Sequence, residues 1–333
     1  MAKRPPRPRQ RLSVTVRRVL RGSLYIRVSS LDGTPGRPFL LIPGMGVSAT
    51  YFERLAVQLS ADGPVHSLDL PGFGGVPSPP SGLTITEFAD LVAGAIDDLG
   101  LTDPVLIGHS MGTQVAADLA ARRPDLSTVV LIGPVVNAAE RTVSRQALRF
   151  LQTARRERLR VKIVAVGAYL LCGVRWFTRV LPEMMQYRLE DQLPRIQADT
   201  LVVHGQWDRT CPSDWAQTVA DLLPHGEVWQ VPDAAHSVIV AHAAQIADIC
   251  ARHSRRRLTP AEQSPRQRLT PATTRTAEPA ALRKLVTFVR GRGTELLGIV
   301  RADDALIARG KSRHADTLRR TLRSTGDRGS GRR

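Results

Sequence analysis

Cysteine is scarce in this chain of 333 residues. The three cysteines are odd in number and widely spaced, so they do not supply the framework of a disulfide-rich secreted domain. No run of about 18 apolar residues is present to span a bilayer, and no apolar segment follows the basic start at residues 3–11, as a signal peptide requires. We therefore expect a cytoplasmic protein with reduced thiols, with peripheral attachment to a membrane left open. The cysteines are Cys172, Cys211 and Cys250.

Spacings that bind metals are also missing. The eight histidines include no His-Glu-x-x-His pattern, and no two cysteines are spaced as Cys-x-x-Cys. Those patterns place nitrogen and thiolate ligands around one zinc ion, so the sequence gives no indication of a metal site. We expect a function that uses neither a metal nor a bound cofactor.

The positive charge lies mainly at the two ends of the chain. The net charge of +17 divides into +8 for residues 1–21, −5 for residues 22–251 and +14 for residues 252–333. Basic ends of this kind predict weak electrostatic binding to an anionic membrane or to nucleic acid, unless they are solvated tails. The sequence does not indicate an oligomeric state.

Composition also predicts the domain organisation. We expect a basic disordered N-terminus at residues 1–11, a folded domain at 12–251, a linker rich in Arg, Thr and Pro at 252–281, and a basic tail at 282–333. Within the tail, apolar residues at helical spacing predict a short amphipathic helix over Leu282–Val289.

Beyond that short helix the tail has weak signals for structure. Gly291 and Gly293 lower the helix propensity of the residues that follow. The polar, basic segment Arg309–Arg333 is expected to be disordered.

The most informative motif is Gly-x-Ser-x-Gly at residues 108–112, which follows the apolar run Val105–Ile107 and precedes a helical pattern. In the strand-to-helix turn that this motif predicts, glycines remove side-chain clashes around a strained serine. Ser110 is then held exposed as a nucleophile, and the N–H of Met111 points at the oxyanion position. An ordinary turn rich in Gly and Ser is the alternative.

An acid and a histidine follow this serine in the chain. Asp208 comes directly after the strand pattern at residues 200–203, and His236 comes after the next strand pattern, at 227–231. Serine, acid and histidine in this order, each after a strand, are typical of one class of serine hydrolase. In such a site the histidine takes the serine proton and returns it to the leaving group, while the carboxylate fixes the tautomer.

With these residues in this order, the chain resembles the α/β-hydrolase family over residues 12–251. The likeness includes the Asp-Leu-Pro-Gly-Phe-Gly segment at 69–74, which often follows the fourth strand of its members. The resemblance implies that Ser110 is the nucleophile, His236 the general base and acid, and Asp208 the orienting carboxylate.

The resemblance also implies a second oxyanion donor and an alternative acid. The donor is the N–H of Met45, in a loop where this chain has Pro43-Gly44 and many relatives have His-Gly. The alternative acid is Glu140, because some relatives carry their acid after the sixth strand.

A different class of protein is suggested by the same loop. Gly44, Gly46 and Ala49 match the Gly-x-Gly-x-x-Ala form of a dinucleotide fingerprint, and Asp69 lies about 20 residues further on, as a ribose-binding acid does. This interpretation leaves Ser110 and the residues after it unexplained.

The expected fold is the α/β-hydrolase fold. Strand and helix patterns alternate from Phe39 to Ile132, which predicts a mostly parallel central sheet with helices on both faces. Residues 135–196 interrupt this alternation with helical periodicity, where related hydrolases place a helical lid. Within this insertion the apolar run Ile163–Val174 is flanked by Lys and Arg. This suits either a hydrophobic or acyl substrate or a lid helix that packs on the core with solvated arginines.

We therefore expect a serine hydrolase that cleaves a carboxylic ester or thioester through an acyl-enzyme intermediate. A carbon–carbon bond hydrolase or a perhydrolase would use the same triad, and only the pocket distinguishes them. The alternatives from other classes are the dinucleotide enzyme and a non-catalytic binding protein on the same fold.

Overall fold

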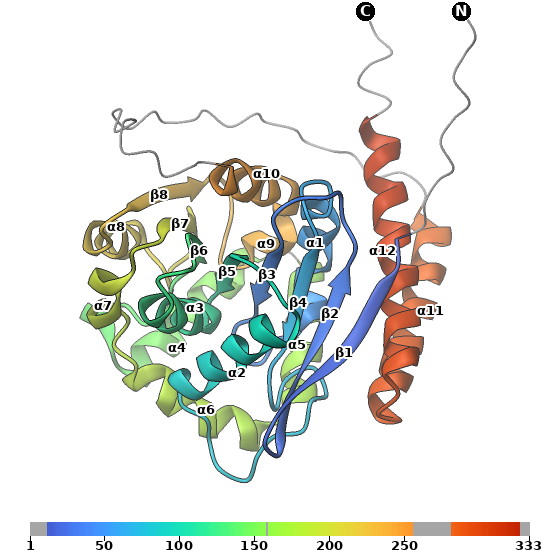
Figure 1. Cartoon of the computed structure of the whole chain (residues 1–333), viewed down its shortest axis with the longest axis horizontal. Helices are drawn as coiled ribbons and strands as arrows, with labels where there is room; N and C mark the ends of the chain where they lie inside the picture. The colour runs from blue at the N-terminus through green and yellow to red at the C-terminus, as the bar shows by residue number, and fades with distance from the viewer. Residues whose placement is uncertain (1–11, 158, 256–280, 327–333) are drawn as a thin grey trace, which may run out of the picture. The chain divides into compact units, whose positions relative to one another are not determined.

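Figure 1 shows the computed structural model of the chain, which describes residues 12–157, 159–255 and 281–326. The predicted N-terminal segment 1–11 and nearly all of the predicted linker lie outside these described residues.

The chain divides into two compact units. The larger unit is Val16–Thr273, and the smaller one combines Met1–Thr15 with Thr274–Arg333.

A sheet of eight strands forms the centre of the larger unit. Its order is β1-β2-β4-β3-β5-β6-β7-β8, with β2 antiparallel to β4 and every pair from β4 to β8 parallel. The strands are β1 (Val14–Arg21), β2 (Leu24–Leu31), β3 (Phe39–Ile42), β4 (Val65–Asp69), β5 (Val105–His109), β6 (Thr128–Ile132), β7 (Asp199–Gly205) and β8 (Gly226–Val231).

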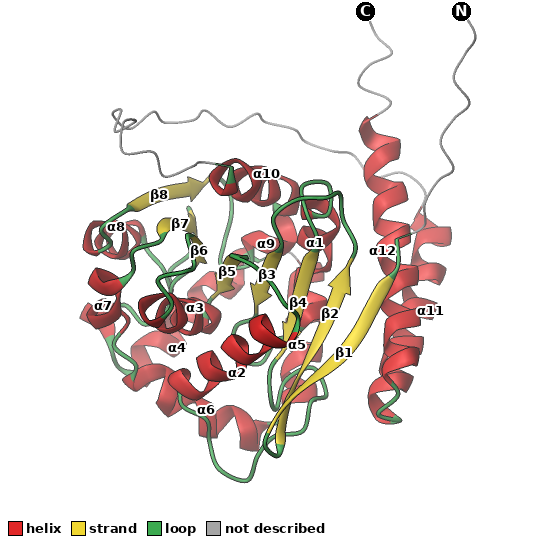
Figure 2. Ribbon diagram, in the orientation of Figure 1, coloured by secondary structure: helices red, strands yellow, loops and turns green. Residues whose placement is uncertain are grey.

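The central strands show no alternation of apolar and polar residues because both of their faces are covered. Every residue of β3, β5 and β6 is buried. Helix α1 (Glu53–Leu59) packs with α10 (Ala243–Ser254) on one face, and α2 (Ile85–Asp98) with α3 (Met111–Arg122) on the other (Figures 1 and 2). The sheet with helices on both faces is therefore as predicted.

The register of the parallel strands brings their carboxyl ends to one edge of the sheet. Ile42 pairs with Gly108, His109 with Ile132, and Gly205 with Val231. The loops after β3, β5, β7 and β8 consequently open at the same edge, which is where ligands bind in open α/β sheets. Two further helices follow these strands, α8 (Ser213–Leu222) and α9 (Val238–Ala241).

A helical insertion separates β6 from β7, within the predicted range 135–196. Its buried side chains include Trp176 and Val180, and α3 holds it through a hydrogen bond from Gln114 Nε2 to the carbonyl of Met184 at 3.0 Å. The insertion contains α4 (Val143–Arg156), α5 (Leu159–Cys172), α6 (Val174–Gln186) and α7 (Leu189–Gln192), with short turns of helix at Ala138–Glu140 and Leu193–Arg195.

In the smaller unit, α11 (Ala281–Val300) and α12 (Asp304–Gly326) pack against each other. The prediction of disorder from Arg309 onward is wrong for residues 309–326, and the first helix continues through Gly291 and Gly293. A Cβ at Gly310 would lie only 2.8 Å from the carbonyl oxygen of Gly291. Glycine thus lowers helix propensity here but permits close approach of two helix backbones.

Candidate active site

Ser110 occupies a sharp turn between β5 and α3. Its backbone has φ 56° and ψ −124°, a conformation that residues other than glycine rarely adopt. The turn is fixed by a hydrogen bond from the N–H of Ser110 to the carbonyl of Ile132 at 2.9 Å. Glycine is required on both sides, since a Cβ at Gly108 would lie 2.3 Å from the carbonyl oxygen of Gly112.

The loop after β3 lies directly against Ser110. A Cβ at Gly44 would come within 2.8 Å of the Ser110 Cβ and 3.3 Å of its Oγ. On the other side Met111 is the first residue of α3 and is fully buried. The loop that contains Met45 and the N-terminus of α3 therefore flank the same serine.

Asp208 and His236 are in direct contact at the ends of β7 and β8. His236 Nδ1 lies 2.7 Å from Asp208 Oδ2. The other carboxylate oxygen, Oδ1, accepts hydrogen bonds from the Thr210 hydroxyl at 2.6 Å, the Thr210 N–H at 2.9 Å and the Cys211 N–H at 3.2 Å. Both carboxylate oxygens are thus engaged, as burial of a charged group requires.

The pair shifts the pKa values of both side chains. Burial disfavours the charged Asp208, but His236 and the hydrogen bonds from Thr210 outweigh it and lower the pKa of this carboxyl to about 2. Burial also disfavours a charged imidazole, yet the charge and hydrogen bond of Asp208 outweigh it and raise the pKa of His236 above its ordinary value. An ionised Asp208 is the partner that an imidazolium at His236 needs.

Gly133, at the end of β6, makes room for this pair and was not identified from the sequence. A Cβ at Gly133 would lie 3.0 Å from the Cε1 and Nδ1 atoms of His236 and 3.3 Å from Asp208 Oδ2. Its φ of +58° also favours glycine. The sequence does carry a signal for this role. Gly133 directly follows a predicted strand, as the expected triad residues do.

His109 packs against His236. Their ring centroids are 4.8 Å apart, and His109 Nε2 lies 3.1 Å from the carbonyl oxygen of His236. Burial, together with the neighbouring His236, lowers the pKa of His109 to about 3, so this ring stays neutral. A neutral, buried ring in this position packs against His236.

A polar network next to His236 was also missed from the sequence. The Tyr51 hydroxyl contacts the Ser237 hydroxyl, and the Ser237 N–H donates to Glu157 Oε1 at 2.7 Å. Glu157 follows α4 directly, so this network ties the helical insertion to the loop that holds His236.

The alternative acid and the dinucleotide residues are occupied elsewhere. Glu140 forms an ion pair with Arg149 inside the insertion. Asp69 is 1% exposed, and its carboxylate accepts from the Ala49 N–H at 2.6 Å and lies 3.5 Å from Arg27. Because a ribose-binding carboxylate must face the ligand, this geometry does not support a dinucleotide site.

Aromatic side chains of the insertion contact the loops after β3 and β4. The ring of Tyr169, on α5, lies 2.4 Å from where a Cβ of Gly46 would be, and Trp176 Nε1, on α6, lies 1.9 Å from that of Gly72. Bulky aromatic side chains therefore rest directly on two backbone turns that only glycine accommodates.

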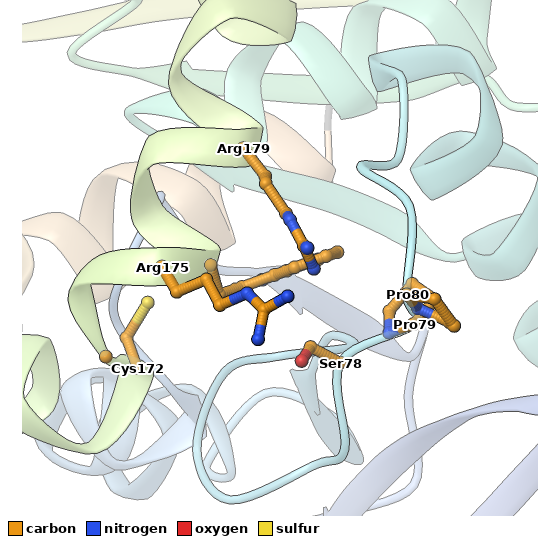
Figure 3. A pocket seen from close by; sticks show the side chains of 8 residues that line it. Ser78, Pro79, Pro80, Cys172, Arg175 and Arg179 are labelled. Carbon is orange, nitrogen blue, oxygen red and sulfur yellow. The ribbon is translucent and has the colours of Figure 1, made fainter.

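A cavity of about 510 Å³ lies where α5 and α6 meet the loop after β4. Figure 3 shows Arg175 and Arg179 pointing their guanidinium groups into this cavity, opposite Ser78. Across the described part of the chain, no three His, Cys, Asp or Glu side chains are grouped as metal ligands. The remaining lining residues are Pro79, Pro80, Cys172, Gly173 and Trp176.

Comparisons with known proteins agree with this architecture. The sequence profile described as "Alpha/beta hydrolase family" matches residues 39–249. The solved structure of a thermophilic esterase from Thermogutta terrifontis has the same fold, with a TM-score of 0.61 and 22% identity over 74% of this chain and 98% of that one.

Curated relatives are similar over shorter stretches. A putative non-heme haloperoxidase of Mycobacterium phage D29 is 32% identical over 107 residues, which are 32% of this chain and 38% of that protein. A pimeloyl-[acyl-carrier protein] methyl ester esterase of Neisseria meningitidis serogroup C is 41% identical over 85 residues, 26% of this chain and 31% of that protein. The chain thus spans about a third of the length of these curated relatives.

Proposed function

The chain belongs to the alpha/beta hydrolase family, and we propose that it is a serine hydrolase that cleaves a carboxylic ester or thioester. The observation that carries this proposal is the 2.7 Å contact between His236 and Asp208 at the sheet edge where Ser110 is held in a strained turn. A buried ion pair and a strained serine each lower the stability of the folded protein. Features of this kind cluster at catalytic sites, which supports a catalytic role for these residues.

In the proposed mechanism, His236 removes the hydroxyl proton of Ser110 as Oγ attacks the carbonyl carbon of the substrate. Asp208 holds the ring with Nε2 toward the serine and stabilises the imidazolium. The backbone N–H groups of Met45 and Met111 donate to the oxyanion. Collapse of the tetrahedral intermediate breaks the ester or thioester bond, and His236 gives its proton to the departing alcohol or thiol.

Water then completes the cycle. His236 takes a proton from the water that attacks the acyl group on Ser110, and returns it to Ser110 Oγ as the carboxylic acid leaves. No group beyond these residues and water is needed to balance the reaction.

The helical insertion is proposed to act as a lid over a hydrophobic or acyl-containing substrate. Support comes from the aromatic side chains that the insertion lays over the loops at Gly46 and Gly72, and from its apolar composition. The relative named as an esterase of a pimeloyl-[acyl-carrier protein] methyl ester is consistent with an acyl ester as substrate.

A carbon–carbon bond hydrolase or a perhydrolase is the second candidate, because either would use the same triad. The similarity to a protein named as a putative non-heme haloperoxidase supports assaying the perhydrolase reaction as well. The occupied carboxylate of Asp69 disfavours the dinucleotide enzyme.

A substrate panel tests the proposal. Wild-type protein and Ser110→Ala would be assayed on p-nitrophenyl esters and acyl thioesters of increasing chain length, with monochlorodimedone bromination as the perhydrolase assay. We expect ester or thioester turnover that Ser110→Ala lowers by about 10⁴-fold or more. The exposed Ser144→Ala is the control. Turnover that survives in Ser110→Ala would exclude this nucleophile.

Three further expectations remain predictions. The basic ends are proposed to bind anionic membrane or nucleic acid weakly, and the protein is proposed to work in the cytoplasm without a cofactor. The oligomeric state is to be measured.

A further inference from the structure

Helix α5 carries apolar side chains on both of its faces. Its inner side faces the protein, since Val161 and Cys172 are buried and Tyr169 lies over Gly46. A helix that is apolar all round normally has both sides covered. The opposite side of α5 is instead exposed, and we call this set its outer face: Leu159, Ile163, Val166, Leu170 and Leu171. The exposed Val174, the first residue of α6, follows it in the chain.

The outer face belongs to a segment in which exposed apolar side chains are concentrated, and we call these side chains the patch. Leu170 is 78% exposed and Val174 80%. Of the sixteen large apolar side chains that are exposed in the described residues, ten lie between Val143 and Val174. Exposed apolar residues scattered over a surface need no explanation, but their concentration in one segment indicates a surface that binds a partner.

The segment that carries this patch is strongly basic. Residues 141–179 contain ten Lys or Arg and a single acid, Glu157. That acid already accepts a hydrogen bond from the N–H of Ser237. Two of the ten cations are neutralised by acids outside this range, Arg141 by Glu190 and Arg149 by Glu140. The segment keeps an excess of positive charge beside the patch.

Two of these cations are directed into the cavity beside α5. Arg175 follows the exposed Val174 and points into the cavity together with Arg179, one helical turn later (Figure 3). Among the described residues neither guanidinium has a carboxylate within ion-pair distance. Paired guanidinium groups favour phosphate oxygens, which makes a phospholipid headgroup a fitting ligand.

We propose that the outer face of α5 docks onto an anionic phospholipid bilayer with the helix axis in the plane of the membrane, and that the cavity at the C-terminal end of α5 takes a headgroup phosphate between Arg175 and Arg179. Aliphatic side chains enter the boundary of the acyl region while the cations contact headgroup phosphates, as in other interfacial helices.

The dimensions of the helices fit a surface position. The 14 residues of α5 span about 21 Å, less than the roughly 30 Å of a bilayer core. No single helix in the described ranges is long and apolar enough to cross a membrane. Val161–Cys172 and Val174–Gln186 meet that standard only as a pair, and they are bent by 99°.

Charge argues against a second copy of the chain as the occupant. Two such segments face to face would bring together two surfaces that each keep an excess of Lys and Arg after the pairs of Arg141 with Glu190 and Arg149 with Glu140 are counted. Like charges juxtaposed in an interface are repulsive. An anionic lipid surface removes this repulsion and covers the same apolar side chains.

Vesicle flotation of the full chain tests the proposal. Vesicles of phosphatidylcholine alone and with phosphatidylglycerol would be compared at low salt and at about 0.5 M NaCl, where the Debye length is only a few ångströms. The basic ends attract vesicles at low salt only. Binding through the outer face is expected to persist on the anionic vesicles at high salt, because its apolar part is not screened.

A triple variant, Ile163→Ser with Val166→Ser and Leu170→Ser, removes the centre of the outer face. We expect its high-salt partition to anionic vesicles to fall on the order of 100-fold, since three aliphatic side chains no longer leave water. The matched control carries Leu20→Ser, Leu222→Ser and Val228→Ser, three exposed apolar positions outside the insertion. The control is expected to bind as the wild type does.

A charge variant separates the headgroup contact from general attraction. Arg175→Gln with Arg179→Gln is expected to lose the preference for phosphatidylglycerol over phosphatidylcholine, measured at about 0.1 M NaCl. Its control, Arg17→Gln with Arg195→Gln, removes the same charge at exposed positions elsewhere and is expected to keep the preference.

Three results would overturn the proposal. One is equal high-salt binding by the triple variant and its control. Another is a lipid-free wild-type dimer that the triple variant dissociates, which assigns the outer face to a second copy. The third is inhibition of flotation by free phosphate at millimolar concentration with no dependence on the outer face, which assigns the arginines to a soluble anion. Ser110→Ala should float as the wild type does, so docking is judged separately from hydrolysis.

Discussion

Asp208 holds His236 by a 2.7 Å contact between Oδ2 and Nδ1, while its second oxygen is fixed by Thr210. The carboxylate therefore cannot rotate away from the ring without losing hydrogen bonds on both of its oxygens. Because both side chains are buried, the ring keeps one orientation, and the proposed mechanism uses its other nitrogen, Nε2, toward Ser110.

Asp208→Asn should lower kcat by about 10³- to 10⁴-fold, because an amide no longer fixes the productive tautomer or stabilises the imidazolium. The measurement is steady-state ester hydrolysis with circular dichroism to check folding. Glu140→Gln is the matched control, since this acid pairs with Arg149 instead, and it should change kcat by less than about twofold. A large loss of kcat in Glu140→Gln with little loss in Asp208→Asn would identify Glu140 as the acid of the triad.

The pH profile should report the raised pKa of His236. General base catalysis needs the neutral ring, so kcat/KM should fall as pH drops through a value above the ordinary pKa of histidine. Removing the charge in Asp208→Asn removes the interaction that raises this pKa, so the acid limb of the residual activity should move to lower pH. An acid limb that moves to higher pH, or does not move, would contradict the assignment.

Gly133→Ala should impair catalysis more than folding. The new methyl group would lie 3.0 Å from the ring of His236, so we expect kcat to fall by about tenfold or more, because small misplacements of catalytic groups are costly. Gly100→Ala is a matched control: its φ is +60°, close to the +58° of Gly133, but no atom lies within 4 Å of its Cβ. Both variants should lose about 1 kcal/mol of unfolding free energy, and equal kcat values would refute the steric role of Gly133.

A chain shortened after Arg257 should keep ester hydrolysis, because Ser110, Asp208 and His236 all lie in the unit Val16–Thr273. Its salt-dependent binding to nucleic acid should weaken strongly, since most of the +14 charge of residues 252–333 is removed. The measurements are ester turnover and fluorescence anisotropy with a labelled duplex. An inactive or insoluble short chain would show that the α11–α12 unit is integral to the hydrolase.

The sequence predicted those features that depend on local chemistry. The turn at Ser110, the strand ends before Asp208 and His236, and the extent of the helical insertion all follow from glycine spacing and apolar runs. These signals are local, because each needs only a few neighbouring residues to be recognised.

Other features depend on contacts between distant segments, and the sequence did not predict them. Gly133 beside His236 and Glu157 beside Ser237 become visible only when β6, α4 and the last loops meet in space. The helix through Gly291 is a similar case, since low local propensity is compensated by packing against Gly310.

The most direct test of the account is to locate the residue that an active-site probe modifies. Wild-type protein treated with a fluorophosphonate should gain the mass of one adduct, and peptide mapping should place it on Ser110. Ser110→Ala should gain none, while Ser144→Ala should label as fully as the wild type. An adduct on another residue, or undiminished labelling of Ser110→Ala, would contradict the assignment of Ser110 as the nucleophile.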